Sequence, residues 1–502
     1  MKTLLDRKIS IVFLIIQFLV SAALVGITFY VGFIPMKYIV SIIIICVFFL
    51  VYEVFSQLTD KSYIIGRILC AVICLFYVGG GYYCVNTYSS IDEMAGQQVK
   101  IDQISCIVLK DDAAQSIYDT KDYNFGILST NDRANTDKAL SEVKAAIGQE
   151  PMKTEYEDND TLVDALYAKD VNVIIINEAN RNLIEDYYKT FSDDTRVLNT
   201  HNVETVIEEE EKLDDITKTS FNVYLSGIDV YGDIKTTSRS DVNVIATVNP
   251  NTRQILLTST PRDYYVPLSG VSGGIPDKLT HAGIHGVDCS VKTLEDLYDI
   301  DIDYYVRVNF TSVKKIVDLL GGVKVYSDYD FTSDWGPSFK KGYNQVNGKQ
   351  ALAFCRERHH FAEGDYQRGR DHQHMIEAIL NKAMSPDILP NYAELLKTAS
   401  KNFQTNMSTK EITALAKMQL NDMSQWTIKY SNAQGSGAKM TTYAYQSRKL
   451  YVCVPDNDSV AKITKKINKV LNATPDSEDN TDDSDSSDDT SSDGASQDSK
   501  TE

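Results

Sequence analysis

Three apolar stretches in the first hundred residues most constrain what this chain can fold into. They run from Ile9 to Val31, from Met36 to Phe55 and from Ile64 to Val85. Each is close to the roughly 20 residues that an α-helix needs to cross a bilayer. We therefore expect residues 1–97 to form a three-span membrane anchor. A cleaved signal peptide is the alternative for the first stretch, but no small-residue cleavage site precedes the other two.

The positive charges beside these stretches predict which side of the membrane the rest of the chain occupies. Basic residues flank the start of the first stretch and the second loop, namely Lys2, Arg7, Lys8, Lys61 and Arg67. The first loop carries only Lys37. Because basic loops stay in the cytoplasm, we expect a multi-pass protein of the cell membrane whose remaining residues lie outside the cell.

Charge also excludes one class of partner. The formal net charge is −19, and the segment from Asp476 to Glu502 contains eleven acids and one lysine. Such a segment cannot bury enough apolar surface to fold, so residues 474–502 are predicted to be a disordered acidic tail. An acidic chain outside the membrane repels nucleic acid, and we expect no nucleic-acid partner.

The eight cysteines do not form a recognisable framework. Four lie in the predicted spans, and Cys106, Cys289, Cys355 and Cys453 are scattered along the external part without CxxC spacing. This arrangement indicates neither a metal motif nor a small disulfide scaffold. A bridge between Cys289 and Cys355 stays open, although apolar core positions are the simpler expectation for these residues.

Residues 98–215 have the pattern of a small α/β accessory domain. The segments CIVLK, NFGIL and VNVIIIN are predicted strands, and helices are predicted at Asp137 to Ile147, Thr161 to Ala168 and Leu183 to Tyr188. The domain ends in a charged run at residues 208–212 that is typical of a linker. Its charges are scattered, so we expect no chemistry in it and place His201 at the surface.

A second α/β unit is predicted over residues 216–473. Its strands are FNVYLSGID, DVNVIATVN, QILLTST, YYVRVNF and LYVCV, with helices at Val291 to Tyr298, Thr311 to Leu320 and Asp371 to Lys382. Gly321 and Gly322 should end the second of these helices. Strands alternating with helices favour a sheet layered between helices.

An arginine cluster stands out within this unit. Between Arg356 and Arg370 the chain has four arginines and no lysine. A guanidinium group presents a planar fork of donors that suits phosphate oxygens, so we interpret the segment as one wall of a phosphate site. The alternative is a solvated face balanced by Glu357, Glu363 and Asp365. If the backbone is extended, Arg356 and Arg358 point to the same side.

Two aspartates are predicted to lie near the phosphate site that the arginine cluster indicates. Asp229 and Arg262 follow strands at the edge of the sheet where ligands gather, and Asp241 opens the next strand after Arg239 in the turn SRSD. Carboxylates together with phosphate oxygens are what Mg²⁺ prefers. The combination therefore predicts Mg²⁺ and a diphosphate or polyphosphate.

The sequence motifs of this second α/β unit form a recognisable set. The segments GID, TTSRSDVNVIATVNP, STPRDYYV, DKLTHAG, DLLGGVKV, GYNQVNGKQALAFCRER and GDYQRGRDHQ occur in this order between residues 221 and 382. They closely resemble the LytR-CpsA-Psr family, and the layout with three leading spans is similar to the capsule-associated CpsA branch of streptococci. The chain departs from the family where Arg-Gln-Gln is usual, since it has Asp371, His372 and Gln373 there.

The resemblance implies both a fold and an activity. The fold is an α-β-α layered domain with a mixed central sheet. The activity is the transfer of a glycosyl phosphate, from capsular polysaccharide or a similar glycopolymer on polyprenyl diphosphate, to a peptidoglycan hydroxyl. A capsule export complex is an expected partner.

The resemblance also implies roles for particular residues. Asp229 and Asp241 would hold Mg²⁺, and a diphosphate clamp would comprise Arg239, Arg262, Arg356, Arg358 and Arg368. The remaining substrate-binding expectations are Lys278, Asp365, Arg370 and Gln373.

Some alternatives stay open at this point. Either Asp241 or Asp365 is a suitable acceptor for the proton of the attacking hydroxyl. The lipid needs an apolar groove, for which Ile316, Leu319, Leu320 and Ile376 are candidates, although ordinary core positions are the better explanation for them. Hydrolysis of the same diphosphate, or a non-enzymatic role as scaffold or regulator of capsule export, are the alternative functions.

Overall fold

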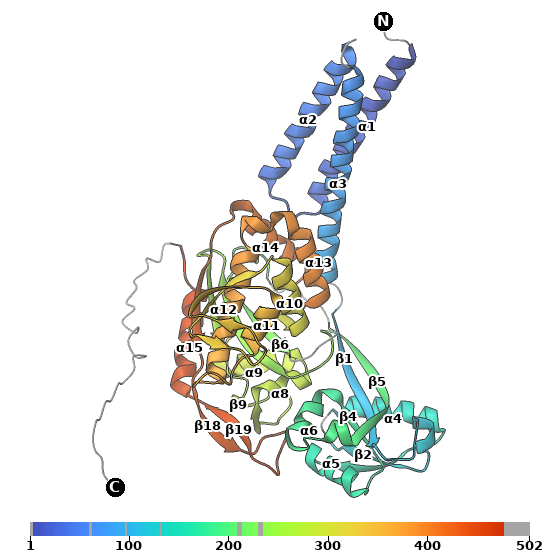
Figure 1. The fold of residues 1–502 in the computed structure, drawn as a ribbon, viewed down its shortest axis with the longest axis vertical. Helices are drawn as coiled ribbons and strands as arrows, with labels where there is room; N and C mark the ends of the chain where they lie inside the picture. The colour runs from blue at the N-terminus through green and yellow to red at the C-terminus, as the bar shows by residue number, and fades with distance from the viewer. Residues whose placement is uncertain are drawn as a thin grey trace, which may run out of the picture.

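The structure of the protein is a computed structural model that describes residues 4–59, 63–95, 98–130, 132–207, 213–228 and 234–475. The expected linker at residues 208–212, the predicted metal ligand Asp229 and the acidic tail from residue 476 onward lie outside the described residues. Two α/β domains lie at one end of a bundle of three long helices, and the smaller domain lies beside the larger one (Figure 1).

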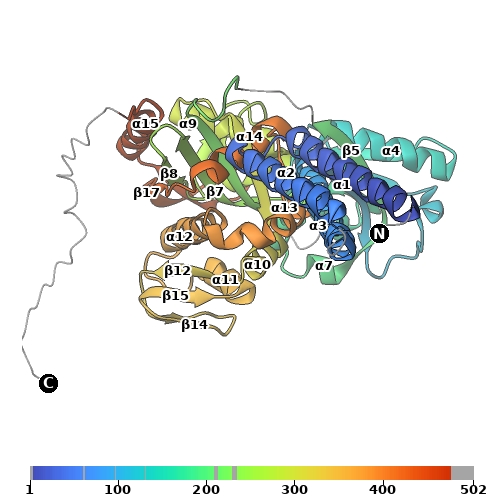
Figure 2. The same ribbon diagram turned by 90° about the horizontal axis from the view of Figure 1, so that it is seen from above.

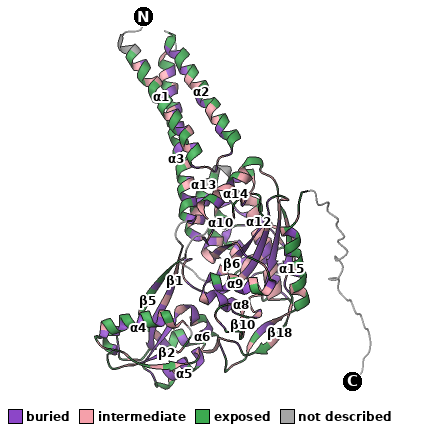
Figure 3. Ribbon diagram, turned by 180° about the vertical axis from the view of Figure 1, so that it is seen from behind, coloured by how far each residue is buried: buried purple, intermediate pink, exposed green. Residues whose placement is uncertain are grey.

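The three expected N-terminal helices are confirmed. Each apolar stretch forms one helix that is long and apolar enough to cross a membrane. The helices are α1 (Leu4–Tyr30), α2 (Met36–Leu58) and α3 (Tyr63–Ala95). Their surfaces are largely exposed and carry large apolar side chains, as lipid-facing helices do (Figure 3). A helix also satisfies its own backbone hydrogen bonds, which is required inside a bilayer.

Helix α3 continues to Ala95, beyond the expected end at Val85, and joins the anchor to the larger domain. Its last turns pack against α13 (Tyr392–Asn402) and α14 (Thr409–Asp422). Ser400 Oγ donates a hydrogen bond to Glu93 Oε2 at 3.1 Å, and Thr409 Oγ1 donates one to Asp92 Oδ1 at 3.1 Å. The anchor and the domain are therefore one continuous packed unit.

The small domain is α/β, as predicted, and its 5-stranded sheet has the order β3-β2-β4-β1-β5. Helix α4 covers one face of this sheet, while α5 and α6 cover the other. The elements are β1 (Gln98–Leu109), η1 (Ile117–Thr120), β2 (Asn124–Leu128), α4 (Arg133–Ile147), β3 (Met152–Tyr156), α5 (Asn159–Ala168), β4 (Val173–Asn177), η2 (Glu178–Asn180), α6 (Arg181–Tyr187), α7 (Phe191–Asp194) and β5 (Thr195–Ile207).

The surface position expected for His201 is wrong. The side chain is buried in β5, where Nδ1 bonds Glu142 and Nε2 lies 3.2 Å from Asn199 Nδ2. A buried ring is tolerated here because both nitrogens have polar partners. Strand β5 was not predicted because most of its residues are polar and they do not alternate regularly with apolar ones.

The large domain contains a mixed 6-stranded sheet with the order β16-β11-β6-β7-β8-β17. Strands β11 and β6 are parallel, as are β17 and β8, whereas β6, β7 and β8 run antiparallel to their neighbours along the chain. The strands are β6 (Phe221–Ile228), β7 (Ser240–Asn249), β8 (Gln254–Ser259), β11 (Tyr304–Asn309), β16 (Gln404–Thr405) and β17 (Thr427–Asn432).

Helices cover both faces of this sheet, which confirms the α-β-α layers. Helices α9 (Val287–Tyr298) and α15 (Asn457–Leu471) pack on one face around Tyr224 and Leu256. Helices α12 (Asp365–Ala383) and α14 pack on the other, around Val223 and Leu257. The smaller elements are β9 (Tyr265–Pro267), β10 (Pro276–Lys278), α8 (Leu279–Ala282), η3 (Gly283–His285), η4 (Pro386–Asn391), β18 (Gly435–Met440) and β19 (Leu450–Pro455).

A lobe beside α12 carries the start of the arginine cluster (Figure 2). It comprises α10 (Phe310–Leu319), β12 (Val323–Ser327), β13 (Phe331–Thr332), β14 (Ser338–Phe339), β15 (Gly342–Val346) and α11 (Gly348–Arg356). Gly321 and Gly322 have φ of 73° and 88° and end α10, as predicted. The extended backbone considered for Arg356 is wrong, because this residue forms the last position of α11.

Candidate functional site

A cavity of about 700 Å³ opens where the ends of β7 and β8 meet the lobe and the small domain. Eight cationic side chains line it together with four carboxylates, so its charge favours anions. The cations are Arg239, Arg262, Lys278, Arg356, Arg358, Arg368, Lys439 and Lys449, and the carboxylates are Asp186, Asp241, Asp263 and Asp334. All five arginines predicted to clamp a diphosphate are therefore brought together.

A β-bulge presents Asp241 to this cavity. In the pairing of β6 with β7, Gly227 lies opposite Val242 and Ile228 lies opposite Ser240, so Asp241 is the extra residue. Bulges re-aim side chains in this way and recur beside functional sites. A Cβ at Gly227 would approach Val242 Cγ2 to 2.6 Å, so the close strand pairing at this point requires glycine.

Arg262 and Thr280 hold the carboxylate of Asp241. Arg262 Nη1 donates to Asp241 Oδ1 at 3.0 Å, and Thr280 Oγ1 donates to the same oxygen at 3.2 Å. Burial opposes ionisation of Asp241, but the charges of Arg262, Arg239 and Arg368 outweigh burial and lower its pKa. The carboxylate is thus ionised at neutral pH, and its Oδ2 accepts no hydrogen bond from the described residues.

Two buried arginine donors are left without acceptors among the described residues. The Nε atoms of Arg239 and Arg262 are both buried and have no hydrogen-bond partner there. Burial without a hydrogen-bond partner is costly for a charged donor, so these two Nε atoms suit an anionic acceptor, although Arg262 Nε also lies 3.9 Å from Asp263 and Asp365.

Arg356 and Arg358 reach the cavity from the end of α11 and the loop after it. The Arg356 guanidinium stacks between two aromatic rings, 3.9 Å from the centroid of Trp335 and 4.6 Å from that of Phe310. Stacking on both rings fixes the plane of the Arg356 guanidinium. Arg358 Nε lies 3.4 Å from His359 Nε2, and no carboxylate of the described residues forms an ion pair with Arg358.

Glu357 shapes the loop that carries Arg358. Its Oε1 accepts hydrogen bonds from the backbone N–H groups of Arg358, His359 and His360, and its Oε2 accepts one from Asp334. The idea that Glu357 balances a solvated arginine face is therefore wrong, since this carboxylate is buried beneath the loop.

Helix α12 supplies Arg368 from its first turn. Gly369 lies against the end of β8, where a Cβ would meet Ser259 Oγ at 2.9 Å, so this glycine lets the helix approach the sheet. Arg368 pairs with Asp365, which is also 3.9 Å from Arg262. Lys278 Nζ lies 3.0 Å from Asp263 on the other side of the cavity.

Two of the predicted substrate-binding residues lie elsewhere. Gln373 is buried and donates to the carbonyl oxygens of Leu257 at 2.8 Å and Ser431 at 2.9 Å, so it ties α12 to β8 and β17. Arg370 bonds Glu363 and Gln367 outside the cavity. Arg370 and Gln373 follow Arg368 by two and five positions on α12, so their side chains leave the helix on other sides and point away from the cavity.

His372 joins α12 to the last turn of α11. Its Nε2 lies 2.9 Å from the carbonyl oxygen of Cys355 and donates to it, since a carbonyl only accepts. Burial and the charge of Arg368 lower the pKa of His372 to about 4, so the ring is neutral at pH 7. Cys289 and Cys355 are free, and so are the other six cysteines, all of which are described.

Comparison with known proteins identifies the family to which this chain belongs. A family model described as the LytR_cpsA_psr family matches residues 187–469, which is more than half of the 502 residues. The chain belongs to the LytR_cpsA_psr family. The cavity arginines all lie inside the matched range.

Named relatives of this LytR_cpsA_psr protein are similar over the same region. It is 32% identical over 258 residues to the polyisoprenyl-teichoic acid–peptidoglycan teichoic acid transferase TagU of Enterococcus faecalis, covering 51% of this chain and 81% of that protein. It is 31% identical over 256 residues to the TagU of Bacillus subtilis, covering 51% and 79%. The crystal structure of B. subtilis TagV is 29% identical, with 51% of this chain and 99% of that chain covered and a TM-score of 0.44.

The small domain of this LytR_cpsA_psr protein forms part of the cavity wall, which corrects the expectation that it takes no part in the chemistry. Asp186 at the end of α6 lies 3.3 Å from Arg239 Nη1, and Tyr187 lines the cavity beside it. The loop between β18 and β19 holds the two domains together through an ion pair of 3.0 Å from Arg448 to Asp160. Sequence patterns could not reveal this contact, because it joins residues far apart in the chain.

An apolar groove of about 380 Å³ lies on the α12 side of the large sheet. Its walls come from β6, β7, β8, β11, α12, α13 and α14. Ile376 lines the groove, as suggested, whereas Ile316 and Leu320 are buried core residues near α11. Arg368 and Ile376 are separated by eight positions of the same helix, a rise of about 12 Å, so α12 passes from the cavity to the groove.

Proposed function

We propose that this protein transfers a glycosyl phosphate from a polyprenyl-diphosphate-linked glycopolymer to a sugar hydroxyl of peptidoglycan. The observation that carries the proposal is the arginine cavity, with the unpartnered Nε donors of Arg239 and Arg262 directed at an anion. The named TagU relatives, which are teichoic acid transferases, support the same class of reaction.

In this reaction the acceptor oxygen attacks the phosphorus that bears the glycan. The bond from that phosphorus to the bridging oxygen breaks, polyprenyl phosphate leaves, and a phosphodiester joins the glycan to peptidoglycan. Catalysis of this step depends mainly on neutralising the charge on the phosphoryl oxygens and needs little covalent help from the protein. Arg356 with its ring-fixed plane and Arg358 without a carboxylate partner suit that task.

We further propose that the cavity binds Mg²⁺. Asp241 fits this ion because its carboxylate is ionised and its Oδ2 is available towards the cavity. Asp229 follows β6 in the sequence, next to the bulge, and would be the second ligand. When bound, Mg²⁺ would neutralise charge on the diphosphate and help to orient it.

The lipid part of the donor would occupy the apolar groove. A polyprenyl chain is entirely apolar, and burial of such a chain against Leu380, Leu395 and Met407 is favourable. Helices α13 and α14, which form one wall, also pack against α3, so the groove lies close to the anchor from which a membrane lipid arrives.

We also infer that the anchor crosses the membrane three times and that both α/β domains lie outside the cell. The first connection, between α1 and α2, lies beside the large domain, while the start of α1 and the end of α2 lie at the far end of the bundle (Figure 1). Lys8 and Arg67 belong to that far end, which suits the cytoplasmic side. A capsule export complex remains an expectation.

Incubation of the full-length protein in detergent with a lipid-linked oligosaccharide and peptidoglycan tests the proposal. We expect polyprenyl phosphate and a glycan–peptidoglycan phosphodiester in equal amounts. Free glycosyl phosphate without the conjugate would establish a hydrolase instead. Release of neither product would favour a scaffold.

A further inference from the structure

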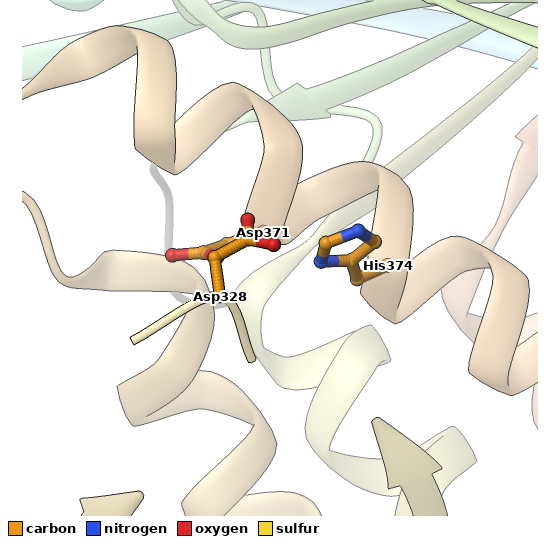
Figure 4. A group of neighbouring side chains, drawn as sticks. All are labelled: Asp328, Asp371 and His374. Atoms are coloured by element: carbon orange, nitrogen blue, oxygen red, sulfur yellow. The ribbon is translucent and has the colours of Figure 1, made fainter. Parts of the chain in front are cut away.

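Three potential metal ligands meet where helix α12 passes the end of strand β12 (Figure 4). Asp371 and His374 come from α12, and Asp328 directly follows β12. One ligand atom of each residue lies within 4.8 Å of those of the other two. Asp371 and His374 are three positions apart, which places both on one face of the helix. None of the three lines the phosphate cavity.

The carboxylate of Asp371 is only half satisfied by the protein. The residue is 0% exposed, and its Oδ1 accepts a hydrogen bond from Gln367 Nε2 at 2.9 Å. Its Oδ2 has no hydrogen-bond partner among the described residues, and His374 Nδ1 is also buried without one. Buried polar atoms nearly always have partners, and each exception calls for an explanation such as an ion.

The surroundings do not supply the missing positive charge. Asp371 lies near the carboxylates of Asp328 and Glu357, and no cation of the described residues forms an ion pair with it. Arg370 forms a long ion pair with Asp328, from Nε to Oδ2 at 3.8 Å, while its guanidinium also binds Glu363 and Gln367. The protein thus concentrates carboxylate groups here without neutralising them.

A second cluster of two carboxylates and one histidine differs in that its buried carboxylate is satisfied by the protein. Asp334, Glu357 and His360 also lie within 4.8 Å of one another. There the buried carboxylate is fully used, since both oxygens of Glu357 accept backbone hydrogen bonds. That cluster is a capped loop and provides a matched control.

We propose that Asp328, Asp371 and His374 bind one divalent transition-metal ion, such as Mn²⁺ or Zn²⁺, at a site separate from the phosphate cavity. The imidazole favours these ions over Mg²⁺ and Ca²⁺, which prefer oxygen ligands alone. Asp328 Oδ2 already accepts a hydrogen bond from Gln367 at 2.8 Å, so Oδ1 is the ligand atom. The rings of Tyr326 and Tyr430, 5.6 Å and 5.3 Å from the His374 ring, fix its orientation.

The ion would join α12 to the lobe. With metal–oxygen distances of about 2.1 Å, neighbouring ligands of an octahedral ion are about 3 Å apart and opposite ligands about 4 Å apart. Small side-chain rotations would bring the three ligand atoms, which now lie within 4.8 Å of one another, to these separations. Asp328 is 31% exposed and provides the entry side, where water completes the coordination. Because α12 also carries Arg368, the ion would fix the position of that arginine relative to Arg356 in the lobe.

Metal binding to the full-length protein in detergent tests this proposal. After treatment with EDTA, Mn²⁺ or Zn²⁺ is titrated in an excess of Mg²⁺, which occupies sites made of oxygen ligands. We expect the wild type to bind one equivalent of metal more than Asp371→Asn. Asp328→Asn should bind this equivalent at least about tenfold more weakly than the wild type, because loss of even an outer-shell contact lowers metal affinity by about tenfold or more. His360→Gln should bind like the wild type.

A thermal unfolding measurement accompanies the titration. The metal should raise the melting temperature of the wild type and of His360→Gln but not of Asp371→Asn, while all three unfold cooperatively in EDTA. Asp328 is partly exposed, so its variant folds even if a change at Asp371 disturbs the core. Equal stoichiometry and affinity in the wild type, Asp371→Asn and Asp328→Asn would overturn the proposal.

Discussion

Arg358 is the residue on which the phosphate site depends most, because it alone of the cluster has neither a carboxylate partner nor a stacked aromatic ring among the described residues. Its position comes from Glu357, which accepts three consecutive backbone N–H groups of the loop. One buried carboxylate therefore sets the direction of the arginine that follows it.

Replacement of Arg358 by alanine should lower the rate of glycosyl-phosphate transfer by about 10²- to 10³-fold, as loss of one preorganised charge does in comparable sites. Arg253→Ala is the control, because Arg253 pairs with Asp422 and stacks on Trp426 away from the cavity. Transfer by the detergent-solubilised protein measures the effect. Similar rates for the two variants would remove Arg358 from the site.

Glu357 should make the protein sensitive to acid. Burial opposes its ionisation, but hydrogen bonds from Asp334, His360, His359 and Arg358 outweigh burial and lower its pKa from 4.5 to about 2. A depressed carboxyl pKa stabilises the fold above pH 4.5, and this contribution is lost as the pH falls towards 2.

The free energy of unfolding of the wild type should therefore fall by about 3 kcal/mol more than that of Glu357→Gln between pH 5 and pH 2. Denaturant titrations at several pH values measure this difference. Glu363→Gln removes an exposed partner of Arg370 and should follow the wild type closely. The same pH dependence in the wild type and in Glu357→Gln would contradict the assigned role.

At the scale of elements, α6 of the small domain and α12 of the large one decide what enters the cavity. The end of α6 places Asp186 against Arg239, so the small domain competes with an anion for one of the clamp arginines. Helix α12 bears Arg368 at its start and Ile376, Leu380 and Ala383 along the apolar groove. A single helix thus connects the charged cavity to the apolar groove.

Asp186→Asn should strengthen the binding of inorganic pyrophosphate by about two- to fivefold, because exposed ion pairs of this kind are worth up to about 1 kcal/mol. Calorimetric titration of the full-length protein measures the affinity. Asp164→Asn, on an exposed side of the same domain, should leave it unchanged. Weaker binding by Asp186→Asn would mean that Asp186 assists the anion instead of competing with it.

Ala383→Phe should fill the end of the groove. We expect the kcat/KM for a long-chain polyprenyl donor to fall by about tenfold, with little change for a short-chain donor. A tenfold loss corresponds to about 1.4 kcal/mol, which is close to the free energy of burying one large apolar group. Asn381→Phe is the matched control, since Asn381 is exposed on the same helix and does not line the groove. An equal loss with both donors would exclude the groove as the lipid site.

At the scale of the whole molecule, the three long helices extend from one end of the large domain and the small domain lies beside the large one (Figure 1). The proposed topology has both domains outside the cell. A reporter phosphatase that folds only outside the cytoplasm tests this topology. Fused after residue 475 it should be active, and fused after Thr59 it should be inactive. Activity at Thr59 would contradict the three-span arrangement.

Long apolar runs and glycine pairs made much of this architecture predictable. The three spans, the strands β6, β7 and β8, and the end of α10 at Gly321 follow from local pattern alone. Strands β3 and β5 were missed because most of their residues are polar and neither shows a sustained apolar pattern. Local sequence also could not show that Arg356 ends a helix, since its stacking on Trp335 is a tertiary contact.

The candidate site was predictable to a similar extent. The motifs predicted that five arginines and Asp241 lie together, and all six line the cavity. Arg239, Asp241 and Arg262 lie at strand ends and Arg368 at the start of α12, whereas Arg356 and Arg358 reach the cavity from the end of α11. They did not separate Arg370 and Gln373 from the cavity, which depends on how α12 is rotated against the sheet. Asp186 had no local signal at all, because another domain supplies it.

A structure of the full-length protein with a bound polyprenyl diphosphate tests the central claim most directly. We predict that the phosphates contact Arg262, Arg356 and Arg358, and that the prenyl chain lies against Ile376 and Leu380 in the groove. A lipid bound elsewhere, with Arg262 still paired to Asp241 and the cavity free of phosphate, would contradict the account.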